Sequence, residues 1–156
     1  MIRTYNQKDA EFVIQSHYEL YSQEYGYDLS FKKFIEGNVH GLINRSRADE
    51  NIWIVDIVGE PKGSIGLGSV DDETAQLGLF LVDPSLRGQG YGHQLIETCI
   101  KFCQDHAKKR IILYTNEELT AARHLYRMHG FSLKETWTST KSNKALKEEL
   151  WEKLLF

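Results

Sequence analysis

The stretch Leu79-Phe80-Leu81-Val82-Asp83-Pro84-Ser85-Leu86-Arg87-Gly88-Gln89-Gly90-Tyr91-Gly92 decides how the rest of this chain is organised. Its apolar start predicts a buried strand, and its glycine-rich end opens directly into a predicted helix over residues 91–108. The three glycines lack Cβ atoms, so their backbone can adopt positive φ and approach a ligand closely. Because the first amides of a helix also favour an anion, this stretch predicts a seat for a phosphate or diphosphate, with Arg87 as a fixed charge.

Two better-known phosphate loops do not fit these residues. A dinucleotide fingerprint requires its third glycine three positions after the second, and that position is His93. A nucleoside-triphosphate loop requires Lys-Ser/Thr after its last glycine, where this chain has His93-Gln94. A turn that merely joins two elements is the remaining alternative, and three alternating glycines after an arginine make it the weaker interpretation.

Length and composition indicate one domain, residues 1–156, with a core of its own. The net charge of −3 arises from 19 basic and 22 acidic residues without a basic block, which argues against nucleic acid or a membrane as partner. A small molecule or a peptide terminus fits this composition better.

The cysteines and the N-terminus favour a cytoplasmic protein. Cys99 and Cys103 are four residues apart on the apolar face of the predicted helix, so we expect buried, reduced thiols. Residues 1–5 lack the apolar core of a signal peptide, and no apolar run approaches membrane length. We therefore expect a cytoplasmic protein without a metal or a membrane partner, as a monomer or a homodimer.

The first half of the chain predicts a strand, two helices and a three-stranded meander. Residues 2–5 form the strand, one helix ends near Gly26, and Ser30 caps the next helix. In the meander we expect a turn over residues 59–63 and a bulge or a close approach at two glycines. The third strand is apolar on both faces, which predicts the centre of the sheet. The glycines are Gly66 and Gly68; one face of the strand carries Leu77, Leu79 and Leu81, the other Phe80 and Val82.

The second half predicts a parallel crossover and a terminal hairpin. Residues 111–115 read as a buried strand, parallel to the one that ends at Val82 because a helix connects the two. Residues 117–129 predict another helix that Gly130 ends. Two terminal strands, residues 131–139 and 149–156, are expected around a polar loop over residues 141–147.

The pattern Arg87-Gly88-Gln89-Gly90-Tyr91-Gly92, after a strand that ends in Val82-Asp83-Pro84, closely resembles the acyl-CoA loop of the GCN5-related N-acetyltransferase (GNAT) superfamily. A second segment, residues 122–131 (ARHLYRMHGF), resembles the family's Ala-x-x-Leu-Tyr-x-x-x-Gly-Phe signature. The order of predicted elements also resembles the GNAT fold, an α/β (α+β) fold with a mixed twisted sheet of about six to seven strands flanked by about four helices. The resemblance thus covers essentially the whole chain. Within the superfamily, His17, Glu24-Tyr25-Gly26 and Phe31 look like the acetyltransferase half of MarR-GNAT fusion proteins.

The resemblance implies an N-acetyltransferase that uses acetyl-CoA as co-substrate. It places pantetheine against the strand end Phe80-Leu81-Val82 and the diphosphate on the loop Arg87 to Gly92, which includes Gln89 and Tyr91. Tyr126 matches the tyrosine commonly assigned to protonate the leaving sulfur, with packing under the last strand as the alternative. Leu119 stands where the family often has an asparagine, and Asn116 does not inherit that role automatically.

The acceptor and the general base are predicted from residues 21–28, a segment rich in aromatics and carboxylates. Tyr21, Glu24 and Tyr25 could orient an amine, while ordinary helix packing is the plainer interpretation. A primary amine titrates near ~10.4, so a base or a water chain must take its proton at neutral pH. Relatives often place a carboxylate on the central strand where this chain has Gln76, which leaves Glu24 and Glu73 as candidates.

We therefore expect direct transfer of an acetyl group to a primary amine of a small molecule or peptide, with Tyr126 and Glu24 as catalytic residues. The missing carboxylate and asparagine leave a second interpretation, a non-catalytic acyl-CoA-binding sensor or interaction module. General nucleotide binding is a third.

Overall fold

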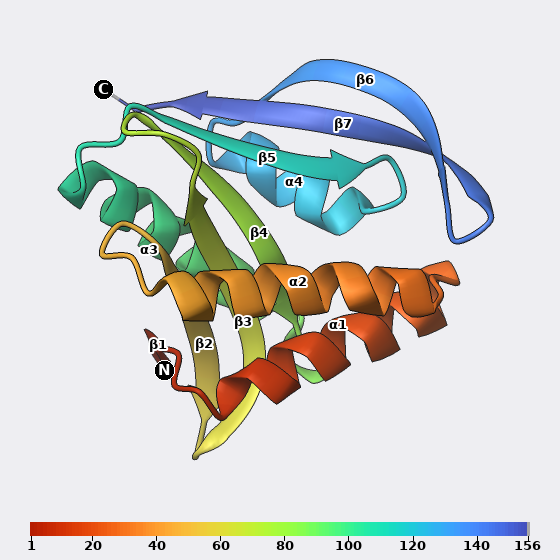
Figure 1. Cartoon of the computed structure of the whole chain (residues 1–156), viewed down its shortest axis with the longest axis horizontal. Coiled ribbons are helices and arrows are strands. Elements are labelled where there is room, and N and C mark those ends of the chain that lie inside the picture. The colour runs from red at the N-terminus through yellow and green to blue at the C-terminus, as the bar shows by residue number, and fades with distance from the viewer. Residues whose placement is uncertain (156) are drawn as a thin grey trace.

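The computed structural model describes residues 1–155. It shows a seven-stranded mixed sheet with two helices packed against each face (Figure 1). The strand order is β1-β2-β3-β4-β5-β7-β6, in which β4 and β5 are parallel and every other neighbouring pair is antiparallel. The expected α/β (α+β) fold and the parallel crossover are confirmed. The strands are β1 (Ile2–Thr4), β2 (Asn51–Ile57), β3 (Glu60–Ser69), β4 (Thr74–Val82), β5 (Arg110–Asn116), β6 (Ser132–Lys141) and β7 (Lys144–Leu154); the helices are α1 (Asp9–Tyr25), α2 (Leu29–Arg45), the 3₁₀ turn η1 (Pro84–Leu86), α3 (Tyr91–Asp105) and α4 (Thr120–Met128).

The central strand β4 carries a bulge at Leu79, whereas the sequence predicted a bulge or a close approach at Gly66 and Gly68 of the preceding strand. The register changes from Ser64 opposite Leu81 to Gly66 opposite Gly78, so β4 holds one extra residue, and Leu79 has a φ of 51°. A Cβ on Gly66 would lie 3.0 Å from the Leu79 side chain, which makes this glycine the place of a close approach. Beyond the bulge β4 no longer pairs with β5, whose last pair is Leu77 with Leu113.

The bulge also changes which side chains share a face, because one extra residue reverses the alternation of a strand. Leu77 packs in the core under α3 and α4, and Phe80 and Val82 join that same core. Leu79 packs instead against α1 and α2. The prediction that Leu77 and Leu79 share one face was therefore wrong, although both faces of β4 are apolar and β4 is the fourth of the seven strands.

Two predicted helix and loop boundaries are corrected by local hydrogen bonds. Asp28, not Ser30, caps α2, because its carboxylate accepts a hydrogen bond from the Ser30 amide at 2.9 Å. The polar loop expected over residues 141–147 is a two-residue turn in which Ser142 and Asn143 have φ values of 50° and 59°. Such a turn matches the twist of two strands, so β7 begins at Lys144. Phe156, predicted in the last strand, lies outside the described residues.

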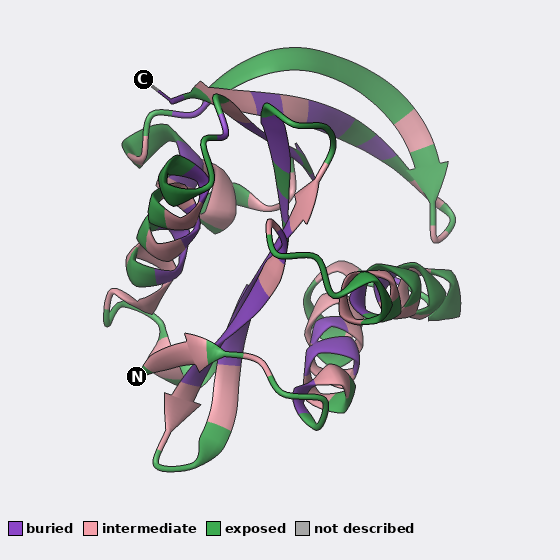
Figure 2. Ribbon diagram, turned by 60° about the vertical axis from the view of Figure 1, so that its left-hand side comes forward, coloured by how far each residue is buried: buried purple, intermediate pink, exposed green. Residues whose placement is uncertain are grey.

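A similar turn at Val58 and Gly59 replaces the longer turn expected over residues 59–63. Both terminal strands are long, but β6 is exposed along most of its length, whereas the purple segments in Figure 2 follow the central strands and the inner sides of the helices.

Cys99 and Cys103 are buried in α3 and free, as predicted, and burial raises the pKa of Cys103 to about 12. Of the helices described over residues 1–155, none has the length and apolar character needed to span a membrane.

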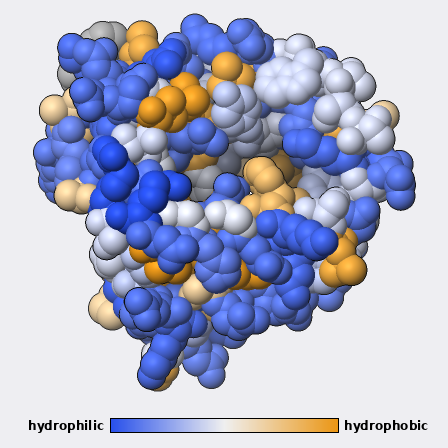
Figure 3. Space-filling model, in the orientation of Figure 1, coloured by the Kyte–Doolittle hydropathy of each residue, from blue (hydrophilic) through white to orange (hydrophobic). Residues whose placement is uncertain are grey.

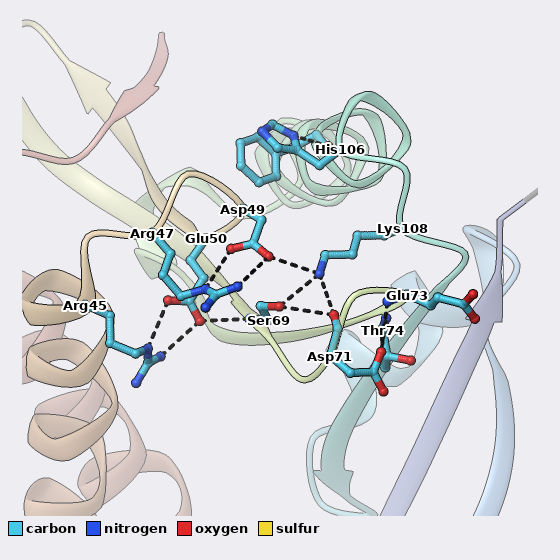
Figure 4. Close-up of polar contacts among 11 residues, drawn as sticks. Arg45, Arg47, Asp49, Glu50, Ser69, Asp71, Glu73, Thr74, His106 and Lys108 are labelled. Carbon is cyan, nitrogen blue, oxygen red and sulfur yellow. Dashed lines mark hydrogen bonds and ion pairs between the residues drawn. The ribbon is translucent and has the colours of Figure 1, made fainter.

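One buried cation ties the loops at the end of the sheet opposite the glycine-rich stretch. Lys108 is 4% exposed, and its ammonium donates hydrogen bonds to Asp49, to the hydroxyl of Ser69 and to the backbone oxygen of Asp71 (Figure 4). Arg47 and Lys108 lower the pKa of Asp49, so its carboxylate stays charged. Because every ammonium proton has a partner, burying this charge is tolerated.

Candidate functional site

A cavity of about 560 Å³ lies where the end of β4, the glycine-rich loop, the end of α1 and the start of α4 meet. β4 contributes apolar side chains at one end, and the loop contributes backbone at the other. The predicted residues that line it are Tyr21, Glu24, Tyr25, Phe80, Leu81, Val82, Arg87, Gly88, Gly90, Tyr91 and Gly92. Leu20, Leu86, His93, Leu119, Ala121, Ala122, His124 and Leu125 line it as well, and the sequence analysis did not single out their side chains for this role. The structure therefore brings most predicted site residues to one place.

The glycine-rich loop presents unpaired backbone donors to this cavity. Gly88 and Gly90 have φ values of 80° and 86°, a conformation that favours glycine, and Gly90 is the N-cap of α3. The backbone N–H groups of residues 88–93 donate no hydrogen bond to any residue between 1 and 155. Together with the positive end of α3, they form a site that suits an anion such as a diphosphate.

Gly92 has a different role from the two glycines before it. A Cβ at this position would lie 2.8 Å from Leu125 and 3.4 Å from Phe80. The absence of a side chain therefore lets α3 start close to α4 and β4, and this packing fixes the direction in which the loop amides point.

Arg87 and Glu24 form an ion pair across the mouth of the cavity. Nη2 of Arg87 lies 2.6 Å from Oε1 of Glu24, and the side chains are 55% and 30% exposed. Both charges act on Tyr25, whose pKa is raised by burial and by Glu24 and lowered by Arg87. The predicted diphosphate arginine and the predicted base are thus partners of each other.

The predicted acceptor tyrosines belong to an aromatic cluster between α1 and α2. Tyr21 stacks on Phe31 with ring centroids 5.0 Å apart, and its edge contacts Tyr25 and Tyr27 at 5.4 and 5.7 Å. Burial raises the pKa of Tyr21 well above its usual value, so its hydroxyl remains a donor. Tyr21 is half-buried, so it both packs in this cluster and lines the cavity.

Tyr126 lies beneath the cavity and is not among its lining residues. It is 5% exposed, and its ring packs 6.0 Å from Phe80, 5.9 Å from Phe131 and 6.4 Å from Trp151. Burial, with a smaller effect of Tyr21, raises the pKa of Tyr126 above its ordinary value. Within residues 1–155 its hydroxyl makes no hydrogen bond to protein, so it is free to donate one.

Other candidates lie elsewhere. Asn116 donates a hydrogen bond to the hydroxyl of Tyr27 at 2.7 Å and accepts one from the Glu118 amide, which is a structural role. Gln89 is exposed and bonds to the Ser85 backbone oxygen. Glu73, a candidate base, pairs with Lys109 at the far end of β4 and does not line the cavity.

His17 is buried against the bulge of β4. Its Nδ1 lies 2.7 Å from the Val13 backbone oxygen, while Nε2 has no partner among residues 1–155. Burial lowers the pKa of His17 to about 4, so the ring is neutral at neutral pH. It therefore supports the aromatic cluster, with its ring 5.9 Å from that of Tyr21.

Comparisons with known proteins point to one family. The model of the acetyltransferase (GNAT) family matches residues 14–131. An uncharacterized N-acetyltransferase of Methanocaldococcus jannaschii is 23% identical over 140 residues, which cover 86% of this chain and 61% of that protein. A mycothiol acetyltransferase of Cellulomonas flavigena is 34% identical over 65 residues, covering 42% of this chain and 19% of that protein. The chain thus spans less than two thirds of the length of these two curated relatives.

Solved structures share the fold along most or all of the chain. An acetyltransferase of the GNAT family from Staphylococcus aureus Mu50 superposes with a TM-score of 0.82 at 21% identity, covering 100% of this chain and 99% of that one. A GNAT family acetyltransferase from Elizabethkingia anophelis with acetyl-CoA bound gives a TM-score of 0.60 at 19% identity, covering 74% and 82%. At these identities the likeness establishes the arrangement of strands and helices.

Proposed function

This chain belongs to the acetyltransferase (GNAT) family, and from that premise we propose that it transfers an acetyl group from acetyl-CoA to a primary amine of a small molecule or peptide. Residues 1–156 act in this proposal as one domain, as a monomer or homodimer in the cytoplasm. The finer resemblance to the acetyltransferase half of MarR-GNAT fusions remains a prediction.

The observation that carries the proposal is the row of unpaired amides at residues 88–93, which opens into the same cavity as the end of β4. In a CoA thioester, a pantetheine arm with apolar and amide groups links the charged diphosphate to the sulfur. The cavity offers a surface for each part in the same order. The loop and Arg87 suit the diphosphate. Phe80, Leu81 and Val82 suit the arm, because β4 has left its pairing with β5 there.

The chemistry assigned to this chain is a direct transfer. The acceptor nitrogen loses a proton and forms a bond to the thioester carbon, the carbon–sulfur bond breaks, and the sulfur leaves as a thiolate that takes up a proton. Tyr126 is our candidate for the group that faces this sulfur. Since its pKa lies above the ~8.5 of a thiol, it stabilises the departing sulfur by donating a hydrogen bond and keeps its own proton at rest.

Glu24 is the candidate that receives or relays the proton of the amine, with Tyr21 and Tyr25 beside it. Its carboxylate pairs with the guanidinium of Arg87. We propose that Arg87 turns to the diphosphate on cofactor binding and leaves the carboxylate free for an ammonium. An ordered water chain is the alternative route for the proton.

Two measurements test the proposed function. Calorimetry should detect CoA and acetyl-CoA binding, and a spectrophotometric assay should detect free thiol when acetyl-CoA is mixed with an acceptor from a panel of amines, amino acids and peptides. Failure to bind acetyl-CoA at high micromolar concentration would overturn the proposal. Binding without turnover of any acceptor would favour a non-catalytic acyl-CoA sensor. This is the second candidate, because Gln76 and Leu119 stand where relatives often have a carboxylate and an asparagine.

A further inference from the structure

A second cavity lies on the α2 side of β4 and shares no lining residue with the one described above. Its volume is about 200 Å³, and it is lined by Gly37 and Asn38 of α2 and by Gln76 and Gly78 of β4, among others. A Cβ built on Gly37 or Gly78 would meet no heavy atom of residues 1–155 within 4 Å. The two glycines therefore leave open space between the helix and the sheet.

Two aromatic side chains continue the same face of the sheet. Gln76 is paired with Ile112, so Tyr114, two residues further along β5, lies on the α2 side as well. Asn116 and Trp137 are both paired with Glu148, which places Trp137 of β6 on this face too. The rings of Tyr114 and Trp137 lie 6.2 Å apart in an edge-to-face arrangement, and the residues are 52% and 40% exposed.

A third aromatic residue stands on the helix across from them. Phe34 precedes Asn38 by one turn of α2 and is 60% exposed. Figure 3 shows a hollow in the surface where Figure 1, in the same orientation, draws α2 facing β5 and β7. The elements that carry these three rings therefore border a recess. We call this recess, bordered by Phe34, Asn38, Gln76, Gly78, Tyr114 and Trp137, the aromatic hollow.

Two sets of contacts connect β5 and the β6–β7 hairpin with the segment between α1 and α2. Tyr27, whose hydroxyl accepts the hydrogen bond of Asn116, contacts Tyr21 of the cofactor cavity. At the tip of the β6–β7 hairpin, Ser142 accepts a hydrogen bond from the Asp28 amide at 2.9 Å and donates one to its carboxylate at 3.0 Å. The second cavity and the cofactor cavity come nearest along the chain at the bulge of β4, because Leu79 lines the former and Phe80 lines the latter.

The charges around the hollow are mostly neutralised within the protein. Arg45, which lines the cavity, forms two hydrogen bonds with Glu50. Glu148, next to Trp137, is 7% exposed and pairs with Lys141 at 3.4 Å. Glu135 is exposed on this face, and residues 1–155 offer it no ionic partner. Exposed rings, two amides and few free charges suit an uncharged planar group better than a second charge.

We propose that the aromatic hollow binds the side group of the acceptor and that the acceptor is a primary amine carrying an aromatic ring on a short aliphatic chain. This inference rests on the proposed function. The ring lies against Tyr114 and Trp137, while the amino group reaches the gap between β4 and β5. When the acceptor is bound, its ring covers aromatic surface that is otherwise exposed to water, which gives the exposed rings around the recess a role.

Competing amines test the inference. In the full chain with saturating acetyl-CoA, kcat/KM for 2-phenylethylamine should exceed that for butylamine by about tenfold or more. Trp137→Ala and Tyr114→Ala should bring this ratio close to one, mainly through KM, and Gly78→Val should raise KM for 2-phenylethylamine by filling the hollow. CoA affinity should be the same in all of these variants.

The matched control is Leu133→Ala. Leu133 is 42% exposed on the same strand as Trp137, but it is paired with Trp151 and lies on the opposite face. This variant should keep the wild-type ratio. An equal preference for butylamine, or a preference for 1,4-diaminobutane through Glu135, would overturn the inference and leave the proposed function standing.

Equilibrium binding separates the two failures. Saturation-transfer NMR in the presence of CoA reports contact between 2-phenylethylamine and the protein without any turnover. If no amine is acetylated but 2-phenylethylamine still binds and Trp137→Ala abolishes the signal, the hollow is supported and the proposed function is not. Absence of contact in the wild-type chain would overturn the hollow.

Discussion

Nη2 of Arg87 lies 2.6 Å from Oε1 of Glu24, so the glycine-rich loop is tied to the C-terminal end of α1. These residues are 63 positions apart in the sequence. The pair has a direct consequence for ligand binding, because one guanidinium group cannot bind a carboxylate and a diphosphate with the same donors. Glu24 and the cofactor are expected to compete for Arg87.

Glu24→Gln should tighten CoA binding about two- to fivefold, because a partly exposed ion pair is worth about 1 kcal/mol or less and a neutral amide competes poorly for the guanidinium. Calorimetry with CoA and with pantetheine, which lacks the diphosphate, measures the effect; pantetheine affinity should not change. The control is Glu19→Gln, an exposed residue of the same helix bonded to Gln15. Weaker CoA binding would mean that Glu24 orients Arg87 for the ligand.

Gly90→Ala should destabilise the chain by about 1–2 kcal/mol, because Gly90 has a φ of 86° at the N-cap of α3. CoA affinity should fall with it, since the displaced backbone carries the amides. Urea unfolding and CoA titration measure the two effects. Gly37→Ala, in the middle of α2 with free space around it, should instead raise stability by about 0.5–1 kcal/mol.

Tyr126→Phe should lower kcat on the order of 10²-fold while leaving CoA affinity and unfolding temperature close to wild type. The ring packs against Phe80, Phe131 and Trp151, and phenylalanine preserves that packing. Steady-state kinetics with a saturating acceptor provide the measurement. An unchanged kcat would reduce Tyr126 to a packing role.

Lys108→Met should destabilise the chain by about 2 kcal/mol, because it removes the partner of Asp49, Ser69 and the Asp71 backbone oxygen at a buried position. The next residue supplies the control. Lys109 is exposed and pairs with Glu73 on the surface, so Lys109→Met should change the free energy of unfolding by less than about 0.5 kcal/mol. Equal losses in both variants would contradict a special role for Lys108.

Stability should fall as the pH drops from about 6.5 to about 4, because His17 is buried neutral. Its pKa in the folded chain is about 4, below the ordinary ~6.5 of the unfolded chain, so its contribution is complete above pH 6.5 and is lost on the way down to pH 4. The shift corresponds to about 3 kcal/mol. His17→Leu should flatten this part of the pH profile of urea unfolding, whereas His40→Leu on the surface should not. A profile that keeps its full slope in His17→Leu would assign the effect to other groups.

Much of the fold could be predicted from local patterns in the sequence. The apolar run of β4, the glycine loop and the periodic apolar face of α3 are contiguous in sequence, so strand, loop and helix could be placed from their order alone. The buried cysteines and the parallel pairing of β4 with β5 followed from the same rules. Boundaries failed where two-residue turns with positive φ formed at residues without glycine, at Ser142 and Asn143.

By itself the sequence determined the order of the elements, the glycine-rich loop at the start of α3 and the family, because these depend on neighbours along the chain. Tertiary structure alone decided that Leu79 bulges, that Glu24 meets Arg87, and that the rings of Tyr114 and Trp137 contact each other on one face of the sheet. Each of these relations joins distant segments or depends on a single left-handed residue that reverses the faces of a strand. Strand register and helix packing set such relations, and neither is encoded in local periodicity.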